Sequence, residues 1–106
     1  MEYDYSIVKD DYGNTLFKFS KELRLLEYVF EDLGSFGEPV FGEYIKNVIT
    51  GKSELEEVEG NMCCLLIRKD FTIISSEFVS GDMSDTLQVE SKQLSLLIDK
   101  WEIEHR

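Results

Sequence analysis

Three segments of this chain repeat apolar residues at helical spacing, and each of them needs a surface on which to bury that stripe. The clearest stripe is the last, at i, i+3, i+4 and i+7: Leu94, Leu97, Ile98 and Trp101. The same spacing recurs within residues 26–33 and 41–48. We therefore predict three amphipathic helices, and a sheet face is the natural surface on which to bury their stripes.

Capping residues set the expected limits of these helices. Ser20 and Ser91 suit N-cap positions, and Pro39 suits the first turn of the second helix. Gly34 and Gly51 suit the position just after a helix. We therefore expect the first helix to end at Gly34 and the second at Gly51. The polar residues of the first helix, residue 32 included, are expected to face solvent.

Six further segments have the composition of β-strands: residues 3–7, 15–19, 53–59, 62–68, 71–78 and 86–89. The first two flank a turn cluster and predict an N-terminal hairpin. Residues 62–68 are almost continuously apolar, which is typical of a central strand, and Gly60-Asn61 resembles a two-residue hairpin link. In the acidic strand before it, Leu55 and Val58 are expected to point inward.

The order of these segments indicates the fold class. Two strands, two helices, four strands and a last helix follow one another, and the short links favour antiparallel pairing. We predict an α+β protein, a two-layer domain in which an antiparallel sheet of about six strands is packed by three helices. Residues 1–106 are expected to form a single domain.

Acidic residues outnumber basic ones by 22 to 11, which gives a net charge of −11, while hydrophobic residues make up 42% of the chain. The hydrophobic content favours a folded protein over an acidic disordered tail. The charge argues against direct contact with nucleic acid, because phosphates would be repelled. We expect no membrane partner and a cytoplasmic location, since no segment has the apolar length of a membrane span or of a signal peptide. We also expect a monomeric state.

No constellation of residues points to catalysis or to a cofactor. His105 stands next to the C-terminus, so no serine has a credible base partner. The adjacent cysteines Cys63 and Cys64 should point to opposite faces of a strand, one of them into the core. They lack the second cluster that a metal or redox site needs. We expect neither enzyme activity, nor a bound metal, nor a cofactor.

The acidic residues are the candidate binding residues. One run places four carboxylates within six residues: Glu54, Glu56, Glu57 and Glu59. Four more acids lie in expected turns and loops: Asp10, Asp11, Asp82 and Asp85. The run can dock a basic surface, or it can simply protect an edge strand against aggregation. A catalytic carboxylate pair would need a cleft, for which a domain of this size has little room.

The layout of the second half of the chain resembles that of a known family. An acidic strand ends in Glu59-Gly60-Asn61, two apolar strands and an acidic loop follow, and residues 86–91 lead into the helix at 92–101. This layout, with the leading hairpin and helix at residues 3–33, resembles the small bacterial immunity proteins of contact-dependent growth inhibition and related polymorphic-toxin systems.

The resemblance implies an intracellular inhibitor that binds a cognate toxin, often a basic nuclease domain, and blocks its active site or substrate surface. It carries over no catalytic residue, so the eight acidic residues above are chosen on charge alone. An alternative with the same charge is a DNA mimic or regulatory adaptor that occupies a basic nucleic-acid-binding protein of the host.

Overall fold

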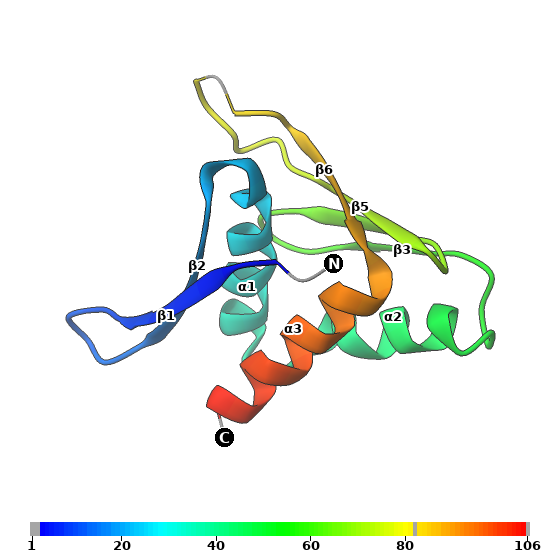
Figure 1. Cartoon of the computed structure of the whole chain (residues 1–106), viewed down its shortest axis with the longest axis horizontal. Coiled ribbons are helices and arrows are strands. Elements are labelled where there is room, and N and C mark those ends of the chain that lie inside the picture. Colours follow the sequence, from blue (N-terminus) through cyan, green and yellow to red (C-terminus); the bar gives the residue numbers. More distant parts are fainter. Residues whose placement is uncertain (1–2, 82, 106) are drawn as a thin grey trace.

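The computed structural model describes residues 3–81 and 83–105 (Figure 1). Its elements, in chain order, are β1 (Tyr5–Lys9), β2 (Thr15–Phe19), a 3-10 helix (Lys21–Leu23), α1 (Leu25–Phe36), α2 (Val40–Ile49), β3 (Glu56–Glu59), β4 (Cys64–Ile67), β5 (Phe71–Ser75), β6 (Thr86–Glu90) and α3 (Ser91–Glu104). The predicted α+β class, with antiparallel strands and three helices, is confirmed. Within the described residues, no helix has both the length and the apolar character needed to cross a membrane.

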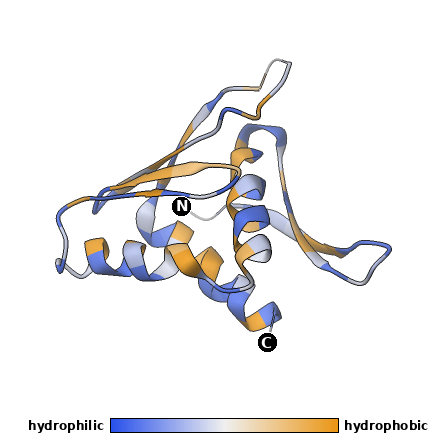
Figure 2. Ribbon diagram, turned by 180° about the vertical axis from the view of Figure 1, so that it is seen from behind, coloured by the Kyte–Doolittle hydropathy of each residue, from blue (hydrophilic) through white to orange (hydrophobic). Residues whose placement is uncertain are grey.

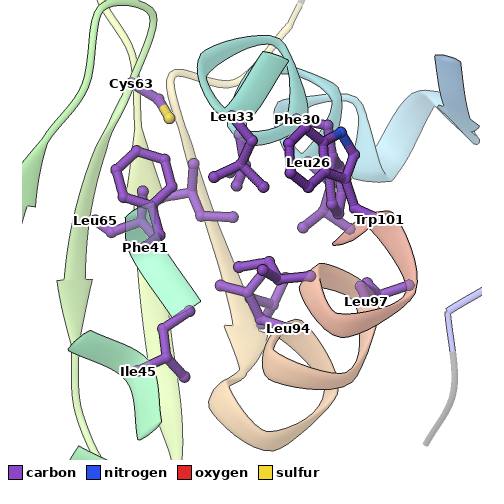
Figure 3. Close-up of a cluster of buried hydrophobic side chains, with 14 of the residues drawn as sticks. Leu26, Phe30, Leu33, Phe41, Ile45, Cys63, Leu65, Leu94, Leu97 and Trp101 are labelled. Carbon is purple, nitrogen blue, oxygen red and sulfur yellow. The ribbon is translucent and has the colours of Figure 1, made fainter. Parts of the chain in front are cut away.

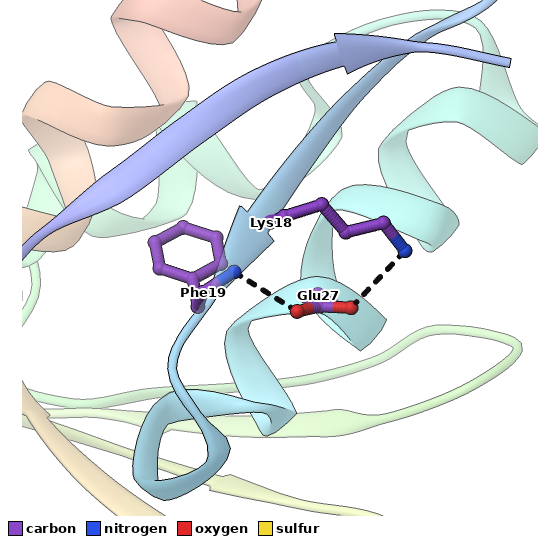
Figure 4. Close-up of polar contacts among 3 residues, drawn as sticks. All are labelled: Lys18, Phe19 and Glu27. Carbon is purple, nitrogen blue, oxygen red and sulfur yellow. Dashed lines mark hydrogen bonds and ion pairs between the residues drawn. The ribbon is translucent and has the colours of Figure 1, made fainter.

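The strands belong to two sheets rather than to one. β1 pairs with β2 in a hairpin, and the other strands form a sheet in the order β3-β4-β5-β6. The hairpin packs on α1, where the rings of Phe17 and Phe19 stack on Phe30 at centroid distances of 5.0 and 5.8 Å. Glu27 of α1 fixes this contact, because its carboxylate accepts a hydrogen bond from the Phe19 amide at 2.9 Å and lies 3.5 Å from the Lys18 ammonium (Figure 4).

The core lies between the four-stranded sheet and the helices. Leu65, Ile67 and Ile74 point from β4 and β5 toward the helices and are fully buried. The three predicted stripes meet them, with Leu33 of α1, Ile45 of α2 and Leu94 of α3 among the contacts (Figure 3). Hydrophobic residues concentrate in the central strands and along the helix faces, while the hairpin turn is hydrophilic (Figure 2). Full burial of one large apolar side chain of this core stabilises the folded state by roughly 1.5–3 kcal/mol.

The first helix ends later than predicted. Gly34 stays inside α1, and the left-handed conformation that ends the helix is that of Gly37, with φ 76° and its amide bonded to the Leu33 carbonyl at 2.9 Å. The second helix is close to its expected limits, since α2 follows Pro39 directly and Gly51 (φ 86°) lies just beyond it.

Ser91 is the first residue of α3 and not its cap. It is buried, and its hydroxyl donates to the Arg68 carbonyl at 2.6 Å and lies 2.7 Å from the hydroxyl of Thr72. The amide of Ser91 also bonds to the Asp70 carbonyl at 3.0 Å. Ser91 therefore ties the start of α3 to the β4–β5 turn.

The link between β3 and β4 is longer than the predicted two residues. Glu59 pairs with Cys64, so residues 60–63 form the turn, which is closed by a bond from the Gly60 amide to the Cys63 carbonyl at 2.8 Å. The prediction for Leu55 is wrong, because this side chain lies before β3 and is 47% exposed. Val58 does reach toward the core and packs against it.

Candidate functional site

The acidic run lies on an edge strand. Strand β3 is the outer strand of its sheet, and within it Glu57 and Glu59 are exposed while Glu56 is half-buried. The carboxylate of Glu56 accepts a hydrogen bond from the Ser53 hydroxyl at 2.9 Å. Glu54 is exposed and precedes the strand. Alternation along the strand therefore makes Glu57 and Glu59 the acids that β3 presents outward.

The hairpin acids occupy the turn between β1 and β2. Asp10 has a structural role there, because its carboxylate accepts hydrogen bonds from the amides of Tyr12 (2.8 Å) and Asn14 (2.9 Å) and from the Asn14 side chain (3.0 Å). These bonds, that of the Asn14 side chain first, lower the pKa of Asp10 below its ordinary value. Asp11 is exposed in the same turn, next to the 91% exposed Tyr12.

The segment between β5 and β6 places one further predicted acid at the end of the sheet where the β3–β4 turn lies. The amide of Ser76 bonds to the Asp85 carbonyl at 3.1 Å, and the Ser76 hydroxyl bonds to the Met62 carbonyl at 2.6 Å. As a result Asp85 and Glu59 line one shallow depression of about 280 Å³, together with Glu77. The predicted acid Asp82 lies outside the described residues.

The predicted acids therefore do not form one patch. Glu59 and Asp85 share the depression, but the turn with Asp10 and Asp11 projects at the far end of the hairpin, away from β3 and from the β5–β6 loop (Figure 1).

The depression is also lined by the β3–β4 turn, and Asp32 of α1 holds that turn in place. Asp32 of α1 was expected to face solvent, yet it is fully buried. Its carboxylate accepts hydrogen bonds from the amides of Asn61 (3.1 Å), Met62 (2.8 and 3.0 Å) and Cys63 (3.1 Å). Three consecutive amides aimed at one carboxylate fix the position of the turn. Because Asp32 and the turn lie far apart in the sequence, no local pattern signals this contact.

The two cysteines are free, and one of them, Cys63, is buried in the core as predicted, although it lies in the β3–β4 turn and not in a strand. Cys63 is buried, and burial, followed by the charge of Asp32, raises the pKa of its thiol. Cys64 is half-buried and lines the depression, and burial followed by the charge of Glu59 raises the pKa of its thiol as well. Neither thiol has the electropositive surroundings of a reactive cysteine.

The described residues contain no group of three His, Cys, Asp or Glu side chains that could hold a metal ion. A larger depression of about 630 Å³ lies between α2 and α3, where the Lys46 ammonium pairs with the Asp99 carboxylate at 2.8 Å. His105 stacks on Trp101, with ring centroids 4.2 Å apart, and its Nδ1 lies 2.7 Å from the Trp101 carbonyl oxygen. The Lys46–Asp99 pair joins α2 to α3, and His105 makes its contacts at the end of α3.

The fold and the surface define a small α+β protein with an outward-facing acidic edge and a shallow acidic depression. No protein-family profile and no solved structure match the chain. A curated protein of Bacillus cereus named "Immunity protein" does match it, with 30% identity over 103 residues, which is 96% of this chain and 87% of that protein. The chain therefore belongs to the immunity proteins.

Proposed function

We propose that this chain neutralises a cognate toxin by binding it one to one, as an inhibitor and not as an enzyme. The observation that carries the proposal is the 30% identity to an immunity protein along 96% of the chain. An inhibitor of this kind needs a complementary surface and no reacting group. The acidic edge and the depression next to it offer such a surface without a catalytic constellation.

The charge of the chain favours a basic toxin, and a nuclease domain is the class that fits best. A nuclease presents Lys and Arg side chains to phosphates, and an anionic inhibitor can cover that surface and be steered toward it. Of the acidic residues selected from the sequence, Glu57, Glu59 and Asp85 have the most suitable positions, since Glu57 and Glu59 are exposed on β3 and Asp85 lines the same depression as Glu59. Glu54 and Glu56, with Asp10 and Asp11 on the hairpin, would add to the long-range field.

Membership of a contact-dependent or other polymorphic-toxin system, and action in the cytoplasm, stay predictions. The alternative of a DNA mimic predicts the same charge but a partner encoded elsewhere in the genome. Gene neighbourhood separates the two, because immunity genes are expected beside the genes of their toxins.

Co-expression in cells tests the proposal. The product of each gene adjacent to that of this chain in the source bacterium would be expressed with and without the chain. We expect one adjacent product to arrest growth, the chain to restore growth, and the two purified proteins to elute as a one-to-one complex. If the toxic product degrades nucleic acid, the chain should stop that degradation. A toxic neighbour that kills equally well in the presence of the folded chain would contradict the proposal.

A further inference from the structure

The four-stranded sheet has a second face that points away from the helices. Successive side chains of a strand point to opposite faces, so the residues that alternate with the buried ones point outward. In β4 these are Cys64 and Leu66, and in β5 they are Phe71, Ile73 and Ser75. Leu66 pairs directly with Ile73, which places apolar side chains side by side at the centre of this face.

Carboxylates border this apolar centre on the β3 side. Glu57 pairs with Leu66, and Glu59 pairs with Cys64, so both acids share the outward face with their partners. We call the set the open face: Glu57, Glu59, Cys64, Leu66, Phe71 and Ile73. Arg68 lies at the β4–β5 turn, which is the opposite end of the face from Glu59.

The open face is in contact with solvent, whereas the opposite face of the sheet is covered by the helices. Phe71 is 46% exposed, and Leu66 and Ile73 are half-buried, whereas Leu65 and Ile74 between them are fully buried against the helices. A half-exposed aromatic ring beside an aliphatic pair, with charges at the rim, has the composition of a protein-binding surface.

The electrostatics of the face indicate the charge of its partner. The carboxylates of Glu59, Glu77 and Glu57 all act on the Cys64 thiol, where they add to the effect of burial in raising its pKa. Three negative groups therefore bear on one point of the open face, within a chain of net charge −11. A cationic protein surface complements such a face.

We propose that the open face is the surface that docks the toxin, with Leu66, Phe71 and Ile73 meeting an apolar group of the toxin and Glu57 and Glu59 meeting its cationic side chains. This inference rests on the proposed function and assigns the contact to one face of the fold. The hairpin tip with Tyr12 and the depression between α2 and α3 then lie outside the contact. A second copy of this chain is disfavoured as the occupant, because two faces with the same acidic edge would repel each other.

Substitutions on the open face test the proposal, with the adjacent-gene toxin that the chain neutralises as the probe. The first variant, Phe71→Ala, removes the exposed ring. The second is a double variant, Leu66→Thr with Ile73→Thr, which replaces both aliphatic side chains by threonine, a residue that still favours strands. Leu96→Ala is the matched control, since Leu96 is a 55% exposed apolar residue on the outward side of α3. Circular dichroism and urea titration would show that each variant is folded. We expect either open-face variant to weaken Kd by about 30-fold or more, and the control to stay within about twofold.

The outcomes separate this inference from the function on which it rests. If the wild-type chain neutralises no adjacent toxin, the proposed function fails, and the inference fails with it. If the wild type protects cells and the folded open-face variants bind as tightly as it does, the function stands and the inference is overturned. A dimer of the free chain in sedimentation equilibrium, abolished by Phe71→Ala, would also overturn it by identifying the face as a self-interface.

Discussion

Asp32 and Met62 are joined by a two-pronged hydrogen bond, in which the Met62 amide lies 2.8 Å from one carboxylate oxygen of Asp32 and 3.0 Å from the other. The amides on either side of Met62 bond to the same carboxylate. A buried carboxylate is tolerated only when its oxygens are satisfied in this way. The helix α1 thus determines where the β3–β4 turn lies, and with it one wall of the acidic depression.

Replacing Asp32 should be among the most damaging single changes in this protein. Asp32→Ala leaves three backbone amides without their acceptor, and we expect the free energy of unfolding to fall by about 3 kcal/mol. Urea denaturation followed by circular dichroism measures the change. Glu31→Ala, at the exposed neighbouring position, should alter stability by no more than about 0.5 kcal/mol. Equal effects of the two substitutions would contradict the role assigned to Asp32.

Substitution of alanine at two glycine positions should change the stability of the fold in opposite directions. A Cβ at Gly60 would collide with the carboxylate oxygen Oδ2 of Asp32 and would lie 2.9 Å from Cζ of Phe41, so Gly60→Ala should destabilise the fold by about 1–3 kcal/mol. Gly34 lies inside α1 with open space around it, so Gly34→Ala should stabilise by up to about 1 kcal/mol. Thermal unfolding of both variants checks the signs, and a stabilising Gly60→Ala would show that the turn is not tightly packed on Asp32.

The adjacent thiols should differ in reactivity. In the native protein a maleimide should modify Cys64 alone, since Cys63 is buried against Asp32. Because the reacting species is the thiolate and the pKa of Cys64 is raised, labelling near neutral pH should be slower than that of an unperturbed thiol and should accelerate as the pH rises. Intact-protein mass spectrometry counts the adducts. Glu59→Gln should speed the reaction by removing a charge that raises this pKa. Two adducts forming at one rate in the native protein would refute the assignment.

The hairpin turn should lose its support in acid. The pKa of Asp10 is lowered in the fold, so its carboxylate stabilises the turn fully at pH values above the pKa of Asp10 in the unfolded chain, about 3.9. That stability is lost as the pH falls through the lower pKa of the folded state. A titration of the Asp10 carboxyl by NMR would locate the folded value. Asn14→Ala removes the largest cause of the shift, so the pKa of Asp10 should rise toward its ordinary value in that variant. An unchanged titration would argue against the bond from Asn14.

Local periodicity was enough to predict most of the fold. The stripe of Leu94 and Trp101 is buried where helical spacing places it, and the strands β4 and β5 alternate between buried residues and half-buried or exposed ones. Burial of a stripe depends on neighbours within a few residues, so the sequence carries it directly. The end of α1 was missed because Gly34 and Gly37 both suit a helix end, and only Gly37 adopts the left-handed conformation.

The surface was less predictable, because it depends on contacts between distant segments. Alternation indicates that Glu57 and Glu59 share a face of β3, but no local pattern places Asp85 in the same depression as Glu59. That arrangement depends on Ser76, which bonds both to Asp85 and to Met62 of the β3–β4 turn. The burial of Asp32 likewise depends on a turn that follows some thirty residues later. Charge counting therefore selected residues that the fold distributes over separate places.

The final prediction concerns how the acids of the open face act. Glu57→Gln with Glu59→Gln removes two charges beside the proposed contact, while Glu31→Gln with Glu43→Gln removes two exposed charges from α1 and α2 and changes the net charge equally. Steering depends on charges close to the contact and is screened over about 10 Å at 0.1 M salt. Stopped-flow association with the adjacent-gene toxin should therefore be slowed more by the first pair, and its salt dependence should flatten. Identical rate losses for both pairs would mean that only the net charge matters, and that the toxin docks at a distance from β3.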